Sequence, residues 1–401
     1  MTIRNHESYL NEVAEAIGIS ADMAERAVSR YQLIGDWLDR KASKITQYNP
    51  QVYTQGSFLL GTVIRPIGDA NEFDIDLVCE LNGNNYDFSM AELKQAVGTE
   101  LQEYAKYHSM KNEPEDKRRC WTMEYADQAK FHLDVLPALP NQTGYKLLLE
   151  QRGHSALAAS DALTETAIGI TDKELPQYRL KPADWPTSNP KGYAAWFHQR
   201  QAAAVMKSRE MVLEDDKRGI YASVDEVPQY RVKTPLQKCV QLLKRHRDSN
   251  YAGDEDKPIS IIITTLSAHA YRGENTLSAT LRTVLTTMEQ FINERGGTSW
   301  VANPINPEEN FADKWAEVPR RKQVFKEWLD KAQRDFGAYL NGAYDSPPDG
   351  FVHSMSESTV KRVSKSLAIA APAIASIAER ASAEATYNES SGEVSKPWVI
   401  R

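Results

Sequence analysis

Residues 55–62 of this 401-residue chain read QGSFLLGT, and residues 73–79 read FDIDLVC. The second segment has the alternation of a β-strand, in which successive side chains point to opposite faces. Asp74 and Asp76 therefore share one face, and the apolar residues between them point to the other. Two like charges this close are unfavourable unless a cation lies between them, and hard divalent cations prefer oxygen ligands. The pair predicts a Mg²⁺ or Mn²⁺ site.

Gly56 and Ser57 stand just before an apolar run, which is typical of a turn that opens a helix. The free N–H groups of a first helical turn, together with the Ser57 hydroxyl, suit a phosphate group. A phosphate site beside a metal site indicates nucleotide chemistry.

A third acid occurs in FHLDVLP at residues 131–137, where Asp134 points away from the apolar face of another expected strand. An Asp-x-Asp pair alone also fits a surface strand that carries alternating acids. A further carboxylate on a strand with such apolar neighbours is costly without a partner. The three acids together favour a catalytic centre.

A Gly-Ser turn, an Asp-x-Asp strand and a later strand aspartate, in this order, resemble the nucleotidyltransferase superfamily that includes DNA polymerase β, poly(A) polymerase and oligoadenylate synthetase. TPLQKCVQLLKRH at 234–246 is similar to the long helix of the oligoadenylate synthetase and cGAS group, and PIS at 258–260 and NPINPEEN at 303–310 are similar to its later motifs. The chain most resembles the bacterial cGAS/DncV-like nucleotidyltransferases (CD-NTases), which make cyclic oligonucleotide signals in anti-phage defence.

This resemblance implies an α/β fold, with a polymerase-β-like nucleotidyltransferase palm, a long N-terminal spine helix and a mainly helical C-terminal lobe. We place the spine helix and palm at 1–210 and the oligoadenylate synthetase-like helical lobe at 211–401. The residues themselves also predict the spine helix, because Ser20 suits an N-cap and apolar residues then recur at three- and four-residue steps. The stretch 144–189, rich in Pro, Gly and Thr, is expected to be an irregular connection or an active-site rim, and not a domain of its own.

By the same resemblance, the catalytic residues would be Asp74, Asp76 and Asp134, which would also hold two Mg²⁺ or Mn²⁺ ions. The residues expected to bind the nucleotide are Gln55, Gly56, Ser57, Lys244 and Ser260.

Two of these nucleotide-binding assignments leave a question open. Lys244 would reach a triphosphate from the second lobe as a point charge, or it is a surface lysine whose stem covers apolar neighbours. Ser260 falls where the family contacts a donor base, and its hydroxyl can serve either purine.

The resemblance therefore implies a metal-dependent nucleotidyltransferase. We expect it to make an adenine-containing cyclic di- or trinucleotide second messenger from ATP, with GTP as a further candidate substrate, in anti-phage defence signalling (CBASS). A linear nucleotidyltransferase that extends RNA or nucleotidylates a protein is the alternative. A regulatory subunit that binds nucleotides without turnover is a third hypothesis. A HORMA-type or other activating protein is a candidate partner beside the nucleoside triphosphates.

The amino-acid composition limits the binding partners and the cellular location that we expect. The net charge of −7 argues against a protein whose whole surface binds nucleic acid. A local contact with nucleic acid through Lys117, Arg118 and Arg119 is still an alternative. The three cysteines show no Cys-x-x-Cys spacing, which fits a reducing cytoplasm without structural zinc. The apolar run at 367–378 contains Pro372 and is too short to span a membrane, so we expect a cytoplasmic protein without membrane contact.

Overall fold

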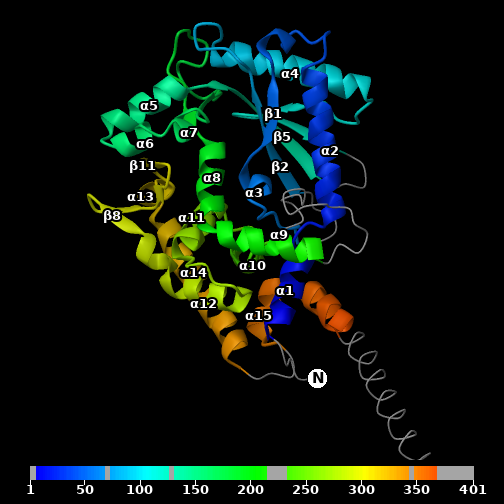
Figure 1. Ribbon diagram of the computed structural model, residues 1–401, viewed down its shortest axis with the longest axis vertical. Helices are drawn as coiled ribbons and strands as arrows, with labels where there is room; N and C mark the ends of the chain where they lie inside the picture. The colour runs from blue at the N-terminus through cyan, green and yellow to red at the C-terminus, as the bar shows by residue number, and fades with distance from the viewer. Residues whose placement is uncertain (1–5, 68–72, 126–130, 215–232, 343–346, 368–401) are drawn as a thin grey trace, which may run out of the picture.

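The computed structural model describes residues 6–67, 73–125, 131–214, 233–342 and 347–367. Figure 1 shows a β-sheet flanked by helices in its upper part and a bundle of helices in its lower part. The predicted α/β palm and the mainly helical C-terminal region are both present. Within these described ranges, no helix is both long and apolar enough to cross a bilayer.

The palm sheet carries the two acid-bearing segments on adjacent central strands. Its main path runs in the order β1, β2, β5, β4, β3, and β6 and β7 extend it from β5. β2 and β5 pair in parallel, whereas the other neighbours pair antiparallel. The strands are β1 (Gln51–Thr54), β2 (Phe73–Glu80), β3 (Glu115–Asp116), β4 (Trp121–Glu124), β5 (Phe131–Pro140), β6 (Ile168–Ile170) and β7 (Thr187–Ser188).

Two long helices cover one face of this sheet. The predicted spine helix is confirmed as α2 (Ala21–Leu38), and the Ser20 side chain accepts a hydrogen bond from the Met23 backbone N–H at its start. α4 (Met90–Tyr107) begins with a capping box made by Ser89 and Glu92. The apolar faces of both helices pack on the buried side chains of β2 and β5 in one hydrophobic core.

The stretch 144–189 is more regular than predicted. It contains most of α5 (Gln142–Gln151), together with α6 (Ser155–Ala158), α7 (Asp161–Thr164), β6 and β7. Two of these helices have only four residues, and α5 buries only Tyr145 and Leu149. Segments this short show no apolar periodicity, so the prediction of an irregular connection was wrong here.

The remaining elements form the lower part of Figure 1 and its connections. The helices are α1 (His6–Ile17), α3 (Gly56–Leu59), α8 (Pro190–Arg200), α9 (Ala202–Glu214), α10 (Pro235–Asn250), α11 (Ser260–Ala270), α12 (Leu277–Thr287), α13 (Lys314–Glu317), α14 (Pro319–Asn341) and α15 (Asp349–Met355). Two small hairpins are made by β8 (Asn293–Arg295) with β9 (Thr298–Trp300), and by β10 (Ala302–Asn303) with β11 (Asn306–Asn310).

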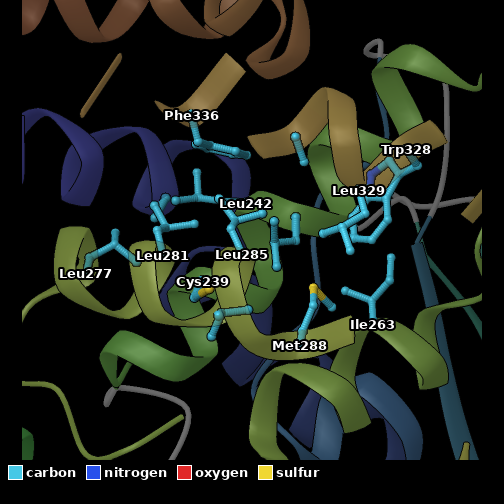
Figure 2. Packing of buried hydrophobic residues seen from close by; sticks show 14 of the residues in the cluster. Cys239, Leu242, Ile263, Leu277, Leu281, Leu285, Met288, Trp328, Leu329 and Phe336 are labelled. Carbon is cyan, nitrogen blue, oxygen red and sulfur yellow. The ribbon is translucent and has the colours of Figure 1, made fainter. Parts of the chain in front are cut away.

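A second hydrophobic core holds the helical part together. Figure 2 shows Cys239 and Leu242 of α10 among Leu281 and Leu285 of α12, with Phe336 of α14 nearby. The N-terminal α1 also packs into this core rather than into the palm core. The division of the chain at residues 210 and 211 stays a prediction.

α10 differs from the helix that its sequence pattern suggests. Its apolar residues are buried as predicted, but so are its polar residues Gln237, Gln241, Lys244 and Arg245. The interpretation of Lys244 as a surface lysine was therefore wrong. The reason is long-range, because the palm segment that follows α3 covers the polar face of α10.

Candidate active site

The parallel pairing of β2 with β5 brings the predicted acids together. Asp76 lies directly opposite Asp134, and Asp74 lies opposite His132. Side chains at matching positions of parallel neighbours point to the same face of the sheet. All three aspartates therefore share one face, and the apolar residues that alternate with them in β2 fill the core on the other.

Asp76 lies at the centre of this group. Burial, the charge of Asp134 and the charge of Asp74, in that order, raise the pKa of Asp76 to about 6, and Lys244 and His132 act in the opposite direction. A carboxylate crowded in this way favours a cation beside it. The donor set thus fits a hard divalent ion.

Asp74 and Asp134 already have protein partners. Asp74, whose side chain is 62% exposed, forms an ion pair with Nε2 of His132. Asp134 accepts a hydrogen bond from the Thr122 hydroxyl on β4. In the part of the chain that the structure describes, no three acidic, histidine or cysteine side chains are arranged closely enough to form a metal site. To join Asp76 and Asp134 on an ion, Asp74 has to leave His132.

The contact between His132 and Asp74 was not predicted from the sequence. The available signal was the position of His132 two residues before Asp134, which mirrors the spacing of Asp74 and Asp76. That signal becomes informative only once the parallel register of the two strands is known.

The predicted phosphate turn lies against the acids. Gly56 has a φ of +59°, and a Cβ atom at this position would lie 2.5 Å from Oδ2 of Asp76. Glycine therefore provides both the left-handed backbone and the space. The Gln55 backbone N–H donates to the Asp76 carbonyl oxygen at 2.8 Å, which ties the start of α3 to β2. Ser57 follows in the first turn of α3 and is partly exposed.

Side chains of α10 hold the segment that follows α3. Nε2 of Gln237 donates to the Leu60 carbonyl oxygen at 2.9 Å, and Nε2 of Gln241 donates to that of Val63 at 2.6 Å. Nζ of Lys244 donates to the Thr62 carbonyl oxygen at 2.9 Å. The three donors lie on successive turns of one helix face, so α10 clamps residues 60–63, which directly follow α3.

Lys244 is the charged member of this clamp, and its side chain is only 6% exposed. Burial and the nearby Arg247 lower its pKa to about 8, whereas Asp248 and Asp76 oppose that change. Lys244 therefore lies within electrostatic range of the acids but contacts a backbone carbonyl. Its contact with a triphosphate stays a prediction.

Ser260 is the first residue of α11. Its hydroxyl oxygen accepts a hydrogen bond from Nη1 of Arg247 at 2.9 Å. Arg247 also donates to the Pro258 carbonyl oxygen, so this arginine orders the start of α11. The structure thus gives Ser260 a protein partner that the sequence did not indicate, and its contact with a base stays a prediction.

Comparison with known proteins agrees with this geometry. Residues 50–137 match the model of the family described as "Cyclic GMP-AMP synthase DncV-like, nucleotidyltransferase domain". This range runs from the residue before β1 into β5 and contains the Gly-Ser turn and all three aspartates.

Two curated proteins are similar over most of their length. A c-di-GMP synthase of Roseivirga ehrenbergii is 28% identical over 82% of this chain and 78% of that protein. The cyclic dinucleotide synthase CdnG of Bradyrhizobium diazoefficiens is 24% identical over 80% of this chain and 73% of that protein.

Solved structures have the same fold. CdnG of Bradyrhizobium diazoefficiens in complex with GTP superposes with a TM-score of 0.67 and 21% identity, covering 90% of this chain and 99% of that chain. The CdnC:HORMA-deltaN complex of E. coli MS115-1 gives a TM-score of 0.57 and 11% identity, covering 88% of this chain and 98% of that chain. The predicted polymerase-β-like fold is confirmed.

Proposed function

Because this chain belongs to the bacterial cGAS/DncV-like nucleotidyltransferases (CD-NTases), we propose that it joins nucleoside triphosphates into a cyclic dinucleotide second messenger. One observation carries the proposal. Asp76 and Asp134 face each other on adjacent parallel strands, and the Gly56 turn lies against the Asp76 carboxylate. A phosphate group bound at this turn would lie beside two carboxylates.

The three aspartates are the proposed metal ligands, with Asp74 exchanging His132 for an ion. When bound, two divalent ions supply a lower pKa for the attacking hydroxyl and neutralise charge on the leaving pyrophosphate. The Thr122 hydroxyl fixes the orientation of the Asp134 carboxylate. The Gly56–Ser57 turn holds phosphate oxygens through its N–H groups and the serine hydroxyl. We assign Asp134 to the acceptor side, where it would receive the proton of the attacking hydroxyl.

The similar proteins support a dinucleotide that contains guanine. One is named a c-di-GMP synthase, and CdnG, a cyclic dinucleotide synthase, was solved with GTP. They favour a ring of two nucleotides over a ring of three, and GTP as a substrate. ATP as a substrate, and the adenine-containing product predicted from the sequence, remain alternatives for the experiment below.

We also propose a cytoplasmic signalling role in anti-phage defence (CBASS). Similarity to CdnC, solved in complex with HORMA-deltaN, supports a HORMA-type protein as a candidate activator. Arg118 and Arg119, considered above for a nucleic-acid contact, both pair with the buried carboxylate of Asp172. These pairs favour a structural role for the two arginines.

The test is to incubate the purified chain with each nucleoside triphosphate, and with each pair, in Mg²⁺ or Mn²⁺. The products are treated with phosphatase, and their masses are measured by mass spectrometry. We expect a phosphatase-resistant cyclic dinucleotide containing guanine, and no product from Asp134→Asn. The exposed Asp36 of α2 provides a matched control, because Asp36→Asn should keep full activity.

Other products would redirect the proposal. Only linear products that lose their terminal phosphates would favour the linear nucleotidyltransferase. Nucleotide binding by calorimetry without any turnover, with a HORMA-type partner also supplied, would favour a regulatory subunit.

A further inference from the structure

Three polar side chains form a row across the palm sheet, beside the proposed metal ligands. Asp74 on β2 lies opposite His132 on β5 in the parallel pairing, and His132 lies opposite Glu124 on β4 in the antiparallel pairing. Residues directly opposite each other on neighbouring strands point to the same face of a sheet. His132 therefore lies between two carboxylates, on the face that also carries Asp76 and Asp134.

The structure pairs His132 with the first of these carboxylates. Its Nε2 contacts Oδ1 of Asp74, and this nitrogen must carry a proton, because a carboxylate oxygen only accepts. The contact occupies Asp74 at the edge of the site. Among the residues whose positions are described, no three possible ligands are close enough to share an ion.

Glu124 is placed to take over the imidazole. Its side chain is exposed at the end of β4, and Nδ2 of Asn112 donates to its Oε2 at 2.6 Å. Cβ atoms at directly opposite positions are about 4.5–5.5 Å apart, so rotation of the His132 side chain brings its N–H within reach of the Glu124 carboxylate. This row of side chains thus has two possible arrangements.

The neighbouring row has no such choice. Asp76 and Asp134 already face each other, and the Thr122 hydroxyl on β4 donates to Oδ1 of Asp134. Two of the three proposed ligands are therefore in place before an ion arrives. Only Asp74 has to change its partner, and His132 is the partner that it leaves.

We propose that His132 is a positioning residue that exchanges Asp74 for Glu124 when Asp74 binds its ion. Without another acceptor, the released imidazole would lose a hydrogen bond to a charged group, and ion binding would be weaker by that amount. Glu124 compensates this loss, which couples strand β4 to the metal site. The inference rests on the proposed function, because it takes the three aspartates as metal ligands.

The exposure of the groups limits the size of the effect. The side chain of His132 is 29% exposed and that of Asp74 is 62% exposed. Water screens contacts this close to the surface, so each contact should change the ion affinity roughly two- to five-fold. The two residues act in opposite directions. Loss of His132 frees Asp74 and strengthens ion binding, whereas loss of Glu124 leaves His132 on Asp74 and weakens it.

The experiment measures the binding of Mn²⁺ to the full chain without nucleotide, from the electron paramagnetic resonance signal of free Mn²⁺. His132→Met removes the N–H donor and should raise the Mn²⁺ affinity roughly two- to five-fold. His132→Gln has nearly the same size as this variant and keeps an N–H donor, so its affinity should stay close to that of the wild-type protein.

Variants of the second acid test the other half of the exchange. Glu124→Gln should lower the Mn²⁺ affinity roughly two- to five-fold, while its amide oxygen can still accept from Asn112. Glu113→Gln is the matched control, because it removes an exposed charge that does not lie opposite His132, and it should change the affinity little.

A double variant separates the exchange from a simple effect of charge. Glu124→Gln removes a negative charge near the ion, which would weaken binding in any background. If Glu124 acts through His132, its replacement has no effect once residue 132 is methionine. We therefore expect the double variant to bind Mn²⁺ as tightly as His132→Met alone.

Nitrogen-15 NMR of the imidazole gives a readout that does not depend on affinity. The ring signal of His132 is assigned by its absence in His132→Gln. Saturating Mg²⁺ should shift this signal, because the ring changes its partner. In Glu124→Gln the signal without metal should stay at the wild-type position, whereas its position with Mg²⁺ should differ.

Three results would overturn the proposal. The first is an equal Mn²⁺ affinity of His132→Met and the wild-type protein. The second is His132→Gln binding as tightly as His132→Met, because the charge of the ring and not its contact would then matter. The third is an equal effect of Glu124→Gln in both backgrounds. Each of these leaves the proposed synthase intact, whereas a wild-type protein that binds no Mn²⁺ even with GTP would contradict the proposed function as well.

Discussion

Replacing Asp76 with asparagine should stabilise the metal-free protein while it abolishes activity. The carboxylate of Asp76 is held in a buried place beside two other acids, which raises its pKa to about 6. The negative charge of Asp76 therefore lowers the stability of the folded protein. Asparagine has nearly the same shape and no charge, so the substitution removes this loss of stability. A gain in stability joined to a loss of function distinguishes a binding carboxylate from a structural one.

The magnitude follows from the pKa difference between the folded and unfolded chain. An aspartate in an unfolded chain has a pKa of about 3.9, so a folded value of about 6 corresponds to about 3 kcal/mol at high pH. Below about pH 4 the carboxyl is protonated in both states, and this cost vanishes. As the pH rises through 6 the folded chain must hold the charge, and the stability present at low pH is lost.

The assay is urea denaturation in EDTA at pH 8 and at pH 4.5, followed by circular dichroism. At pH 8 we expect Asp76→Asn to be more stable than the wild-type protein by up to about 3 kcal/mol. The difference should shrink at pH 4.5. Asp36→Asn should change stability little at either pH, since Asp36 is exposed. An Asp76→Asn protein that is less stable at pH 8, or whose advantage is the same at both pH values, would contradict this account.

Three further predictions concern the surroundings of the site. Gly56→Ala should destabilise the fold by at least about 1–2 kcal/mol, because a left-handed φ of +59° is unfavourable for alanine and its Cβ would press on Asp76; unchanged urea midpoints would contradict this. Gln237→Met should lower the free energy of unfolding by about 2 kcal/mol, since it leaves the Leu60 carbonyl and the Thr234 N–H without their partner, and differential scanning calorimetry would show it as a lower Tm. Asp335→Asn should lower the free energy of unfolding by about 2 kcal/mol at pH 7, because hydrogen bonds from His246 and Lys331 together outweigh burial and lower the pKa of Asp335 to about 2. This loss of stability should shrink as the pH falls from 4 toward 2, and a loss that does not depend on pH would refute the explanation.

The features that could be predicted from the sequence depend on local geometry. Alternation in a strand has a fixed period of two, so the shared face of Asp74 and Asp76 followed from the sequence alone. The N-cap of α2 at Ser20 also depends only on neighbouring residues. Resemblance to a family supplied the order of the larger parts.

The features that were missed depend on residues far apart in the chain. The contact between Asp74 and His132 requires the register of two strands separated by a helix and a hairpin. The burial of Lys244 requires the backbone of Thr62, which lies 182 residues earlier. A helical pattern shows which side chains are polar, but it does not show whether water or a distant carbonyl will satisfy them.

The position of α1 has a consequence for how the chain is made. Its Tyr9 hydroxyl is hydrogen-bonded to Ser364, 355 residues later, and its ring lies 6.5 Å from that of Phe351. A ribosome adds about 5–20 residues per second, so Ser364 follows Tyr9 by roughly 20 to 70 seconds, although α10 and α12, which also pack on α1, are made earlier. The palm strands are complete long before that time. Part of the surface of α1 thus stays uncovered until the last described helices are made, and during this interval it is a candidate binding site for a chaperone.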